Sequence, residues 1–294
     1  MLDPAWAYTP VFLWVALIGL LALLVVRTVR RDRKEYQRFK RYRTTARRQR
    51  MMRRWLLDSF LSFGVLSAVL LLLAGRYVGP LLQELTTWPV VRDIRGWFIH
   101  APGISWGVVI GLTVGLTLVT VLGLRAARAS DEVPMIGDIA AMLPRNRQEL
   151  ALGAAMSVNA GVVEELMFRL ALPAVIFGAT GSAIAAVAGS VLFFGALHLY
   201  QGVNGIIGTT VVGGLFMLAY AVSGTIAVPI VLHALFDLRS LVLIPVAVYQ
   251  VHKVDARVTR IIAPRLVAPG LVAPPVVGST GGSAGSSTPP QDAV

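Results

Sequence analysis

The chain has 294 residues and a net charge of +12, and 56% of its residues are hydrophobic while only 14% are charged. A soluble globular protein carries about 25% charged residues, so this composition predicts a membrane protein. The absence of cysteine excludes a disulfide scaffold, a thiolate metal site and a cysteine nucleophile.

The positive charge is concentrated in one segment, residues 27–54. This segment contains fourteen Lys and Arg against Asp32 and Glu35, so its net charge equals that of the whole chain. It lies between two apolar runs, where the positive-inside rule places such charge on the cytoplasmic side. We expect anionic lipid headgroups as its partner and no nucleic acid, and the alternative is a topology signal without a partner.

Three membrane spans are predicted in the first half, at about residues 5–26, 55–75 and 104–124. The first lacks the flanks of a cleavable signal peptide, so we expect an anchor with its N-terminus outside. The basic segment contains no Gly or Pro and is expected to continue as helix beyond the membrane, with Asp58 pairing with Arg54. Residues 76–103 are predicted to be an outer loop and residues 125–149 a cytoplasmic loop. In the third span, three glycines at four-residue spacing predict a close helix contact, within the bundle or with a second copy: Gly107, Gly111 and Gly115.

Four further apolar runs follow, at about residues 150–177, 182–200, 204–222 and 225–249, joined by short turns that contain Gly. The sequence therefore predicts an all-α polytopic membrane bundle of about seven transmembrane helices, N-terminus out and C-terminus in. We divide it into an N-terminal three-span region (1–149), a four-helix core (150–249) and a cytoplasmic, largely disordered tail (250–294).

Charged residues interrupt the fourth run: Glu164, Glu165 and Arg169. Each charge near the bilayer centre costs about 2.5–3.5 kcal/mol or more, so these residues are a candidate functional site that needs polar partners. On a helix, Glu165 and Arg169 share a face and are expected to pair, whereas Glu164 points about 100° away. A free buried carboxylate of this kind can take a proton from water.

Polar partners occur in two later runs, and the residues form three motifs in order. EExxxR in the fourth run is followed by FxxxH, which ends at His198, and by HxxxD, which runs from His233 to Asp237. Together these motifs resemble the CPBP family of intramembrane proteases, which includes type II CAAX prenyl endopeptidases and bacteriocin-processing and self-immunity proteins. The resemblance covers residues 150–249 only.

The two histidines can orient the attacking water or stabilise the oxyanion of a tetrahedral intermediate. Asp237, one turn after His233, can hold the imidazole tautomer or contact the oxyanion. The resemblance implies the same roles: Glu164 as the base, His198 as its helper, and His233 and Asp237 at the oxyanion site. Two residues depart from the pattern, since CAAX endopeptidases have Asn at the position of Asp237 and members often have Gly at that of Leu170. An ionised Asp cannot donate a hydrogen bond to an oxyanion, so Asp237 needs a proton or another role.

A zinc mechanism is the alternative to metal-free glutamate chemistry, with Glu164, His198 and His233 as ligands and an open fourth position. Either mechanism requires Glu164 and His198 to meet. Glu164 lies about 14 residues, roughly 21 Å, from the start of its run, whereas His198 ends its own run at the cytoplasmic side. The first turns of the fourth span must therefore protrude or bend, or His198 must lie deeper.

The sequence thus predicts an integral membrane endopeptidase of the bacterial plasma membrane. It would hydrolyse a peptide bond of a membrane-associated or prenylated protein or peptide. One alternative is a non-catalytic membrane scaffold or bacteriocin self-immunity protein that keeps the polar cluster for structure. Another is a small transporter in which a carboxylate relays protons.

Overall fold

The computed structural model describes residues 6–103 and 137–255, with single residues scattered between 107 and 125. Every regular element in these parts of the chain is a helix, which confirms the predicted all-α class. Four described helices are long and apolar enough to cross a membrane: Thr9–Lys40, Thr45–Thr87, Leu199–Ser223 and Ala227–Ala247. The total of seven spans and the orientation of the termini stay predictions. Only some residues of the third span are described, but they include Gly107, Gly111 and Gly115, and a Cβ added at any of these would meet no described atom within 4 Å. The predicted close contact within the bundle is therefore not found among the described residues.

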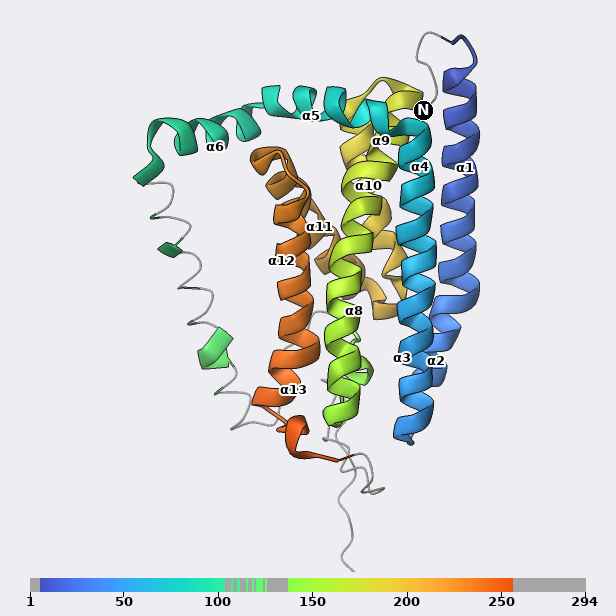
Figure 1. Cartoon of the computed structure of the whole chain (residues 1–294), viewed down its shortest axis with the longest axis vertical. Helices are drawn as coiled ribbons and strands as arrows, with labels where there is room; N and C mark the ends of the chain where they lie inside the picture. The colour runs from blue at the N-terminus through green and yellow to red at the C-terminus, as the bar shows by residue number, and fades with distance from the viewer. Residues whose placement is uncertain are drawn as a thin grey trace, which may run out of the picture.

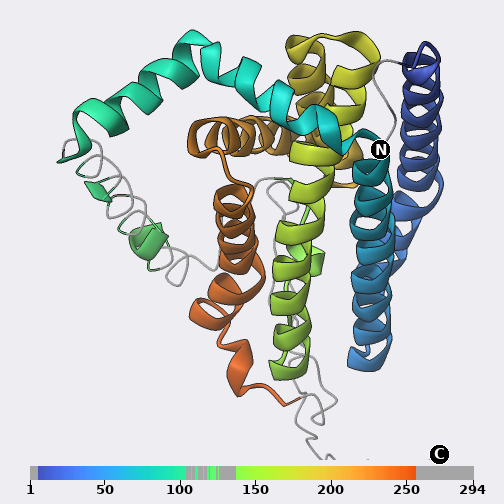
Figure 2. The same cartoon turned by 45° about the horizontal axis from the view of Figure 1, so that its top comes forward.

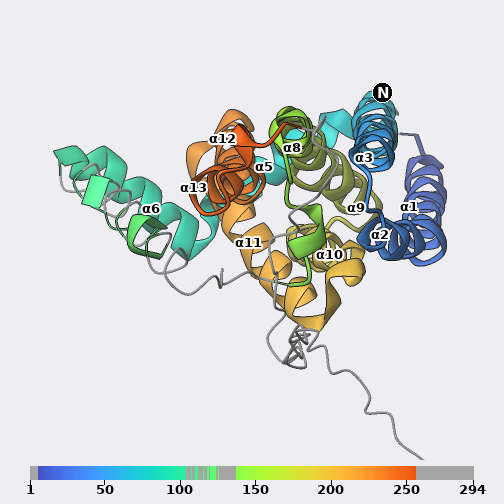
Figure 3. The same ribbon diagram turned by 90° about the horizontal axis from the view of Figure 1, so that it is seen from below.

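The N-terminal region is a helical hairpin. One arm runs through α1 (Thr9–Arg27), the π-helix η1 (Thr28–Asp32) and α2 (Arg33–Lys40). The other arm runs through α3 (Thr45–Ser59), the π-helix η2 (Phe60–Val65) and α4 (Leu66–Ala74). The two arms lie side by side (Figures 1 and 3). The basic segment is therefore helical on both sides of a short turn at residues 41–44, as the lack of Gly and Pro predicts.

The predicted outer loop at residues 76–103 is wrong, because most of it is helical. α5 (Val78–Thr87) and α6 (Pro89–His100) meet at Trp88 and lead away from the end of the bundle (Figures 1 and 2). Both helices bury apolar side chains, and Pro89 occupies the first turn of α6, where its missing N–H costs no hydrogen bond. Mixed charge masked this amphipathic pattern, which is typical of helices at a membrane surface.

The four-helix core follows the predicted runs. It comprises α8 (Arg147–Glu165), η5 (Leu166–Ala171), α9 (Leu172–Thr180), α10 (Ala183–Leu197), η6 (Leu199–Gln201), α11 (Gly202–Ser223), α12 (Ala227–Leu238), η7 (Arg239–Leu243) and α13 (Ile244–Ala247). α9 and α11 each end at a glycine with positive φ, Gly181 at 67° and Gly224 at 71°. This left-handed cap reverses the chain with little steric cost.

α8 lies between α12 and α3 and packs against both (Figure 3). On the other side of the bundle, α1 and α4 pack against α9. Side chains from both regions share one hydrophobic core, with Leu13 and Leu17 of α1 in the same cluster as Met167 and Leu172. The N-terminal helices therefore help to fix the position of the segment that carries EExxxR.

A fully buried ion pair joins α3 to the start of α8. Arg48 Nε lies 3.0 Å from both carboxylate oxygens of Glu149, and neither side chain is exposed. The remaining guanidinium nitrogens of Arg48 donate to the carbonyls of Ala141 and Leu143. Asn146 caps α8 by accepting a hydrogen bond from the backbone N–H of Glu149 at 2.9 Å. The first turn of α8 is thus anchored in the basic part of the hairpin.

We predict that Glu149→Ala lowers the free energy of unfolding by about 3–5 kcal/mol, because it leaves the Arg48 guanidinium buried without its counter-charge. Reversible unfolding in detergent micelles measures the change. Asp93→Asn is the matched control, since the Arg92–Asp93 pair is mostly exposed and such pairs contribute about 0–1 kcal/mol. Equal losses in the two variants would contradict the structural role of the Arg48–Glu149 pair.

Candidate functional site

The site is built around Glu165, whose carboxylate is completely buried at the end of α8. One oxygen, Oε1, accepts a hydrogen bond from Nδ1 of His233 at 2.6 Å. The other, Oε2, lies 2.9 Å from Nε of Arg169 as an ion pair without hydrogen-bond geometry. The predicted Glu165–Arg169 pair is therefore confirmed. The partnership with His233 was missed, because residues 68 positions apart share no helical face that sequence spacing can reveal.

Arg169 ties the buried carboxylate to two other helices. Its Nη2 donates to the carbonyl of Gly213 in α11 at 3.2 Å. Its guanidinium lies over the rings of Phe194 and Phe216, 5.0 and 5.7 Å from their centroids. Both rings also contact the His233 imidazole. A buried charge that is paired, hydrogen-bonded and stacked in this way is rigidly placed.

A cavity of about 460 Å³ lies beside this cluster, and four of the predicted site residues line it: Glu164, His198, His233 and Asp237. Glu164 makes no hydrogen bond or ion pair with any described residue, so its carboxylate is available to a molecule in the cavity. Glu165, in contrast, is committed to the protein on both oxygens. The adjacent carboxylates of EExxxR thus occupy different environments, as the 100° rotation between them requires.

The two histidines have defined hydrogen-bond partners on one ring nitrogen. Nδ1 of His198, which caps α10, lies 2.8 Å from the carbonyl of Phe194. A carbonyl can only accept, so Nδ1 donates and Nε2 is the nitrogen that can accept a hydrogen bond from a bound molecule. Nδ1 of His233 likewise faces the Glu165 carboxylate, and its Nε2 lies 3.8 Å from Asp237 Oδ2. The expectation that Asp237 holds the tautomer of His233 is corrected, because Glu165 makes that contact.

The structure brings Glu164 and His198 to one cavity, as either mechanism requires. The first turns of α8 lie beside the basic part of α3, where Glu149 meets Arg48. Glu164 and His198 then line one cavity although they lie at different distances from the ends of their runs. Both alternatives for the depth of the site in the membrane stay predictions.

The residues of the zinc alternative do not form a metal-binding group here. In the part of the chain that the structure describes, no three His, Asp or Glu side chains gather closely enough to hold a metal ion. The hydrogen bonds on Nδ1 of His198 and His233 leave Nε2 of each ring free and do not themselves argue against a metal, because metal-ligating histidines commonly have such a partner on the other nitrogen. Because the described residues form no such group, no step below is routed through a metal.

The N-terminal hairpin contributes a wall of the same cavity that the motifs alone do not predict. Its lining residues are Arg27, Thr28, Asp32, Tyr36, Trp55, Leu56, Ser59 and Phe63. Some of them carry charge and aromatic surface, and they come from α1, η1, α2, α3 and η2. The site is thus completed by helices that precede the three motifs in the chain.

Fold and site together define an all-helical membrane protein with a polar, histidine-lined cavity beside a buried ion pair. Residues 146–239 match the model of a family described as type II CAAX prenyl endopeptidase Rce1-like. The match covers about a third of the chain and supports the CPBP family membership that the three motifs predict; this family comprises membrane proteases. No curated protein and no solved structure matches the chain.

The contact between Glu165 and His233 depends on the close approach of α8 and α12. Gly161 lies one turn before Glu165, and a Cβ added there would lie 2.9 Å from both Cβ and the backbone nitrogen of Ala234. It would also lie 3.0 Å from the backbone carbonyl of Ile230. Two of these atoms belong to the backbone, so a larger residue at position 161 must push the helices apart.

We predict that Gly161→Ala lowers the free energy of unfolding by about 1–3 kcal/mol, the usual cost of overpacking. Gly214→Ala, in α11, is the matched control because its Cβ would meet nothing nearer than 3.9 Å. That variant is expected to be neutral or stabilising by up to about 1 kcal/mol, since Ala favours helix over Gly. Unfolding in micelles measures both, and a neutral Gly161→Ala would show that the helices can separate freely.

Proposed function

We propose that the protein is an intramembrane endopeptidase in which Glu164 activates the attacking water. The observation that carries the proposal is the contrast between two adjacent carboxylates. Glu165 is neutralised and hydrogen-bonded inside the protein, whereas Glu164 lines the cavity without a partner among the described residues. A structural role explains Glu165 but gives no reason to keep a charged group at position 164.

In the proposed reaction, a water molecule lies between Glu164 and Nε2 of His198. The Glu164 carboxylate takes a proton from this water as the water oxygen bonds to the carbonyl carbon of the scissile peptide. The resulting tetrahedral intermediate carries an oxyanion. Its collapse breaks the C–N bond, and Glu164 returns the proton to the departing amine, so protons and charge balance over the cycle.

His233 is the group proposed to stabilise the oxyanion. Glu165 holds Nδ1 of His233, which leaves Nε2 directed at the cavity near Asp237. An imidazole between two carboxylates can carry a second proton on Nε2, and this N–H can donate a hydrogen bond to the oxyanion without transferring the proton. An ionised Asp237 would then stabilise the positive charge of protonated His233. An Asn at this position would instead donate a hydrogen bond.

We propose peptide bonds of membrane-associated or prenylated proteins as the substrate class. Support comes from the description of the matching family and from the placement of the cavity within apolar helices. We also propose the bacterial plasma membrane as the location, with the basic segment at residues 27–54 on the cytoplasmic side in contact with anionic headgroups. The exposed arginines of α3 supply the charge for this contact.

The alternative of a non-catalytic scaffold or self-immunity protein needs only the buried Arg169–Glu165–His233 cluster. The free carboxylate of Glu164 favours the enzyme over the scaffold, and a variant of this residue distinguishes the two functions.

We predict that Glu164→Gln, which keeps the shape of the side chain, lowers cleavage by at least about a hundredfold because the base is lost. Thermal unfolding is expected to stay unchanged.

The measurement is a comparison of protein termini in membranes from cells that carry the wild type, Glu164→Gln or the control Glu84→Gln at matched expression. Glu84 is an exposed carboxylate on α5, so its variant should retain every new terminus. Termini that disappear only in Glu164→Gln establish proteolysis and identify the substrate. Identical termini in all three samples, with folded protein, would support the scaffold function instead.

A second prediction concerns metal. Because the described histidines and carboxylates do not form a metal-binding group, cleavage by the purified protein is expected to be unchanged by EDTA and by 1,10-phenanthroline. The assay uses a substrate identified from the termini. Loss of activity that zinc restores would replace the metal-free mechanism by the zinc alternative.

A further inference from the structure

The cavity is lined by an arginine to which the proposed chemistry assigns no role. Arg239 is the first residue of the π-helix η7, two positions after Asp237, and its side chain borders the cavity together with Ser240. It lies in one of the four helices long and apolar enough to span a membrane, where a charge is costly unless it serves a purpose. π-Helical turns are rare and are often found at functional sites.

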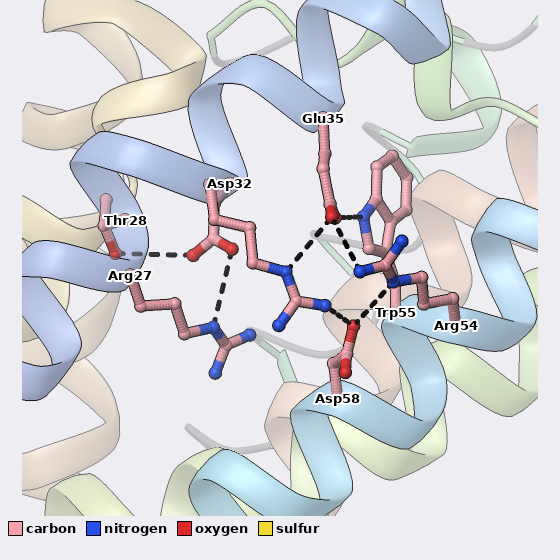
Figure 4. Close-up of polar contacts among 8 residues, drawn as sticks. Arg27, Thr28, Asp32, Glu35, Arg54, Trp55 and Asp58 are labelled. Carbon is pink, nitrogen blue, oxygen red and sulfur yellow. Dashed lines mark hydrogen bonds and ion pairs between the residues drawn. The ribbon is translucent and has the colours of Figure 1, made fainter.

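The other arginines around the cavity already have carboxylate partners. Figure 4 shows Nε of Arg27 directed at Asp32, at 3.4 Å. This pairing depends on η1, because a π-turn places residue i+5 over residue i, which an α-helix does not. Arg27 is further stabilised by the ring of Phe63, 5.0 Å away.

The same holds for the neighbouring part of the hairpin. Arg31 pairs with both Glu35 and Asp58, and Arg54 is within 3.6 Å of the same two carboxylates (Figure 4). The predicted Arg54–Asp58 pair is confirmed as one part of this network. On the catalytic side, Arg169 is paired with Glu165. Each of these guanidinium groups therefore has a counter-charge within the protein, although Nη1 of Arg27 is buried without a hydrogen-bond partner among the described residues.

Arg239 differs from them, because it has no hydrogen bond or ion pair with any residue in the described ranges. Asp237 is close in sequence, but residues two apart on a helix point to different sides and cannot pair. The cavity also contains the carboxylates of Glu164 and Asp237, which would repel a negatively charged ligand. A cation without a partner at this wall supplies the attraction that such a ligand needs.

We propose that Arg239 is the anion-binding residue of the cavity and that it binds a carboxylate of the substrate. The planar guanidinium presents paired N–H donors that match the two oxygens of a carboxylate. The carboxylate comes from the free C-terminus of a peptide or from an Asp or Glu side chain. This inference rests on the proposed function, since the peptide bond to be cleaved must reach Glu164 in the same cavity. Arg239 then determines which peptides bind and does not take part in bond breaking.

A binding experiment separates this inference from the question of catalysis. The full chain with Glu164→Gln is used in detergent micelles, so that ligands are not consumed. Three apolar probes are titrated: N-acetyl-trileucine as the free acid, the same peptide as the C-terminal amide, and N-acetyl-Leu-Leu-Asp-amide. Tryptophan fluorescence reports binding because Trp55 lines the cavity. The arginine variants are Arg239→Gln, Arg239→Lys and, for the other arginine that lines the cavity, Arg27→Gln, with Arg30→Gln as an exposed control on η1.

The free acid is expected to bind about tenfold or more tightly than the amide, the usual contribution of a hydrogen bond to a charged group. Arg239→Gln is expected to abolish this preference, Arg239→Lys to retain part of it, and Arg30→Gln to retain all of it. Tight binding of the free acid alone identifies the chain terminus as the ligand, and equal binding of the Asp-amide identifies a carboxylate in general.

Equal binding of acid and amide to the wild-type cavity would overturn the proposal, as would a preference that survives Arg239→Gln or disappears only in Arg27→Gln. Addition of phosphatidylglycerol in place of phosphatidylcholine tests the competing anion. If the phosphatidylglycerol headgroup binds in an Arg239-dependent manner and the peptide acids do not, the ligand is a lipid phosphate and the proposal fails. The acid preference is measured without turnover, so it stands or falls independently of whether Glu164 is the catalytic base.

Discussion

A carboxylate buried inside a membrane protein needs a counter-charge and a hydrogen-bond donor, and the arrangement around Glu165 follows from that requirement. Arg169 supplies the counter-charge from the next turn of the same helix, and His233 supplies the hydrogen bond from α12. Phe194 of α10 and Phe216 of α11 lie against the Arg169 guanidinium, so both helices approach this ion pair. One buried charge thus brings all the helices that carry the site to one place.

The paired carboxylate of Glu165 and the free carboxylate of Glu164 have different tasks at the site. Glu165 orients His233 and exposes its second nitrogen to the cavity, while Glu164 faces the cavity without a competing partner. The N-terminal hairpin closes the remaining wall, and the arginine that it contributes to this wall, Arg27, is paired with Asp32 (Figure 4). A protease site of this design needs few charged groups, but each must be either fully paired or accessible to substrate.

Sequence patterns predicted the elements that rest on local physics. Helical periodicity predicted that Glu165 pairs with Arg169 and that Glu164 points away from this pair. The lack of Gly and Pro predicted that the basic segment, residues 27–54, is helical. The same reasoning failed at residues 76–103, where mixed charge was taken for a loop although α5 and α6 are amphipathic helices. Of the two roles that it offered for Asp237, one, holding the tautomer of His233, belongs to Glu165 in the structure.

The sequence by itself determined the class of protein, the helical core and the six candidate residues, because hydrophobicity, helical spacing and motif order are local properties of the chain. Only the tertiary structure decided which carboxylate is paired and which is free, and that residues 27–63 line the same cavity as residues 164–239. Those facts depend on how closely helices approach, as at Gly161, and on the registers of π-turns at η1 and η7. Contacts between segments distant in the chain arise from packing, which spacing along one helix does not encode.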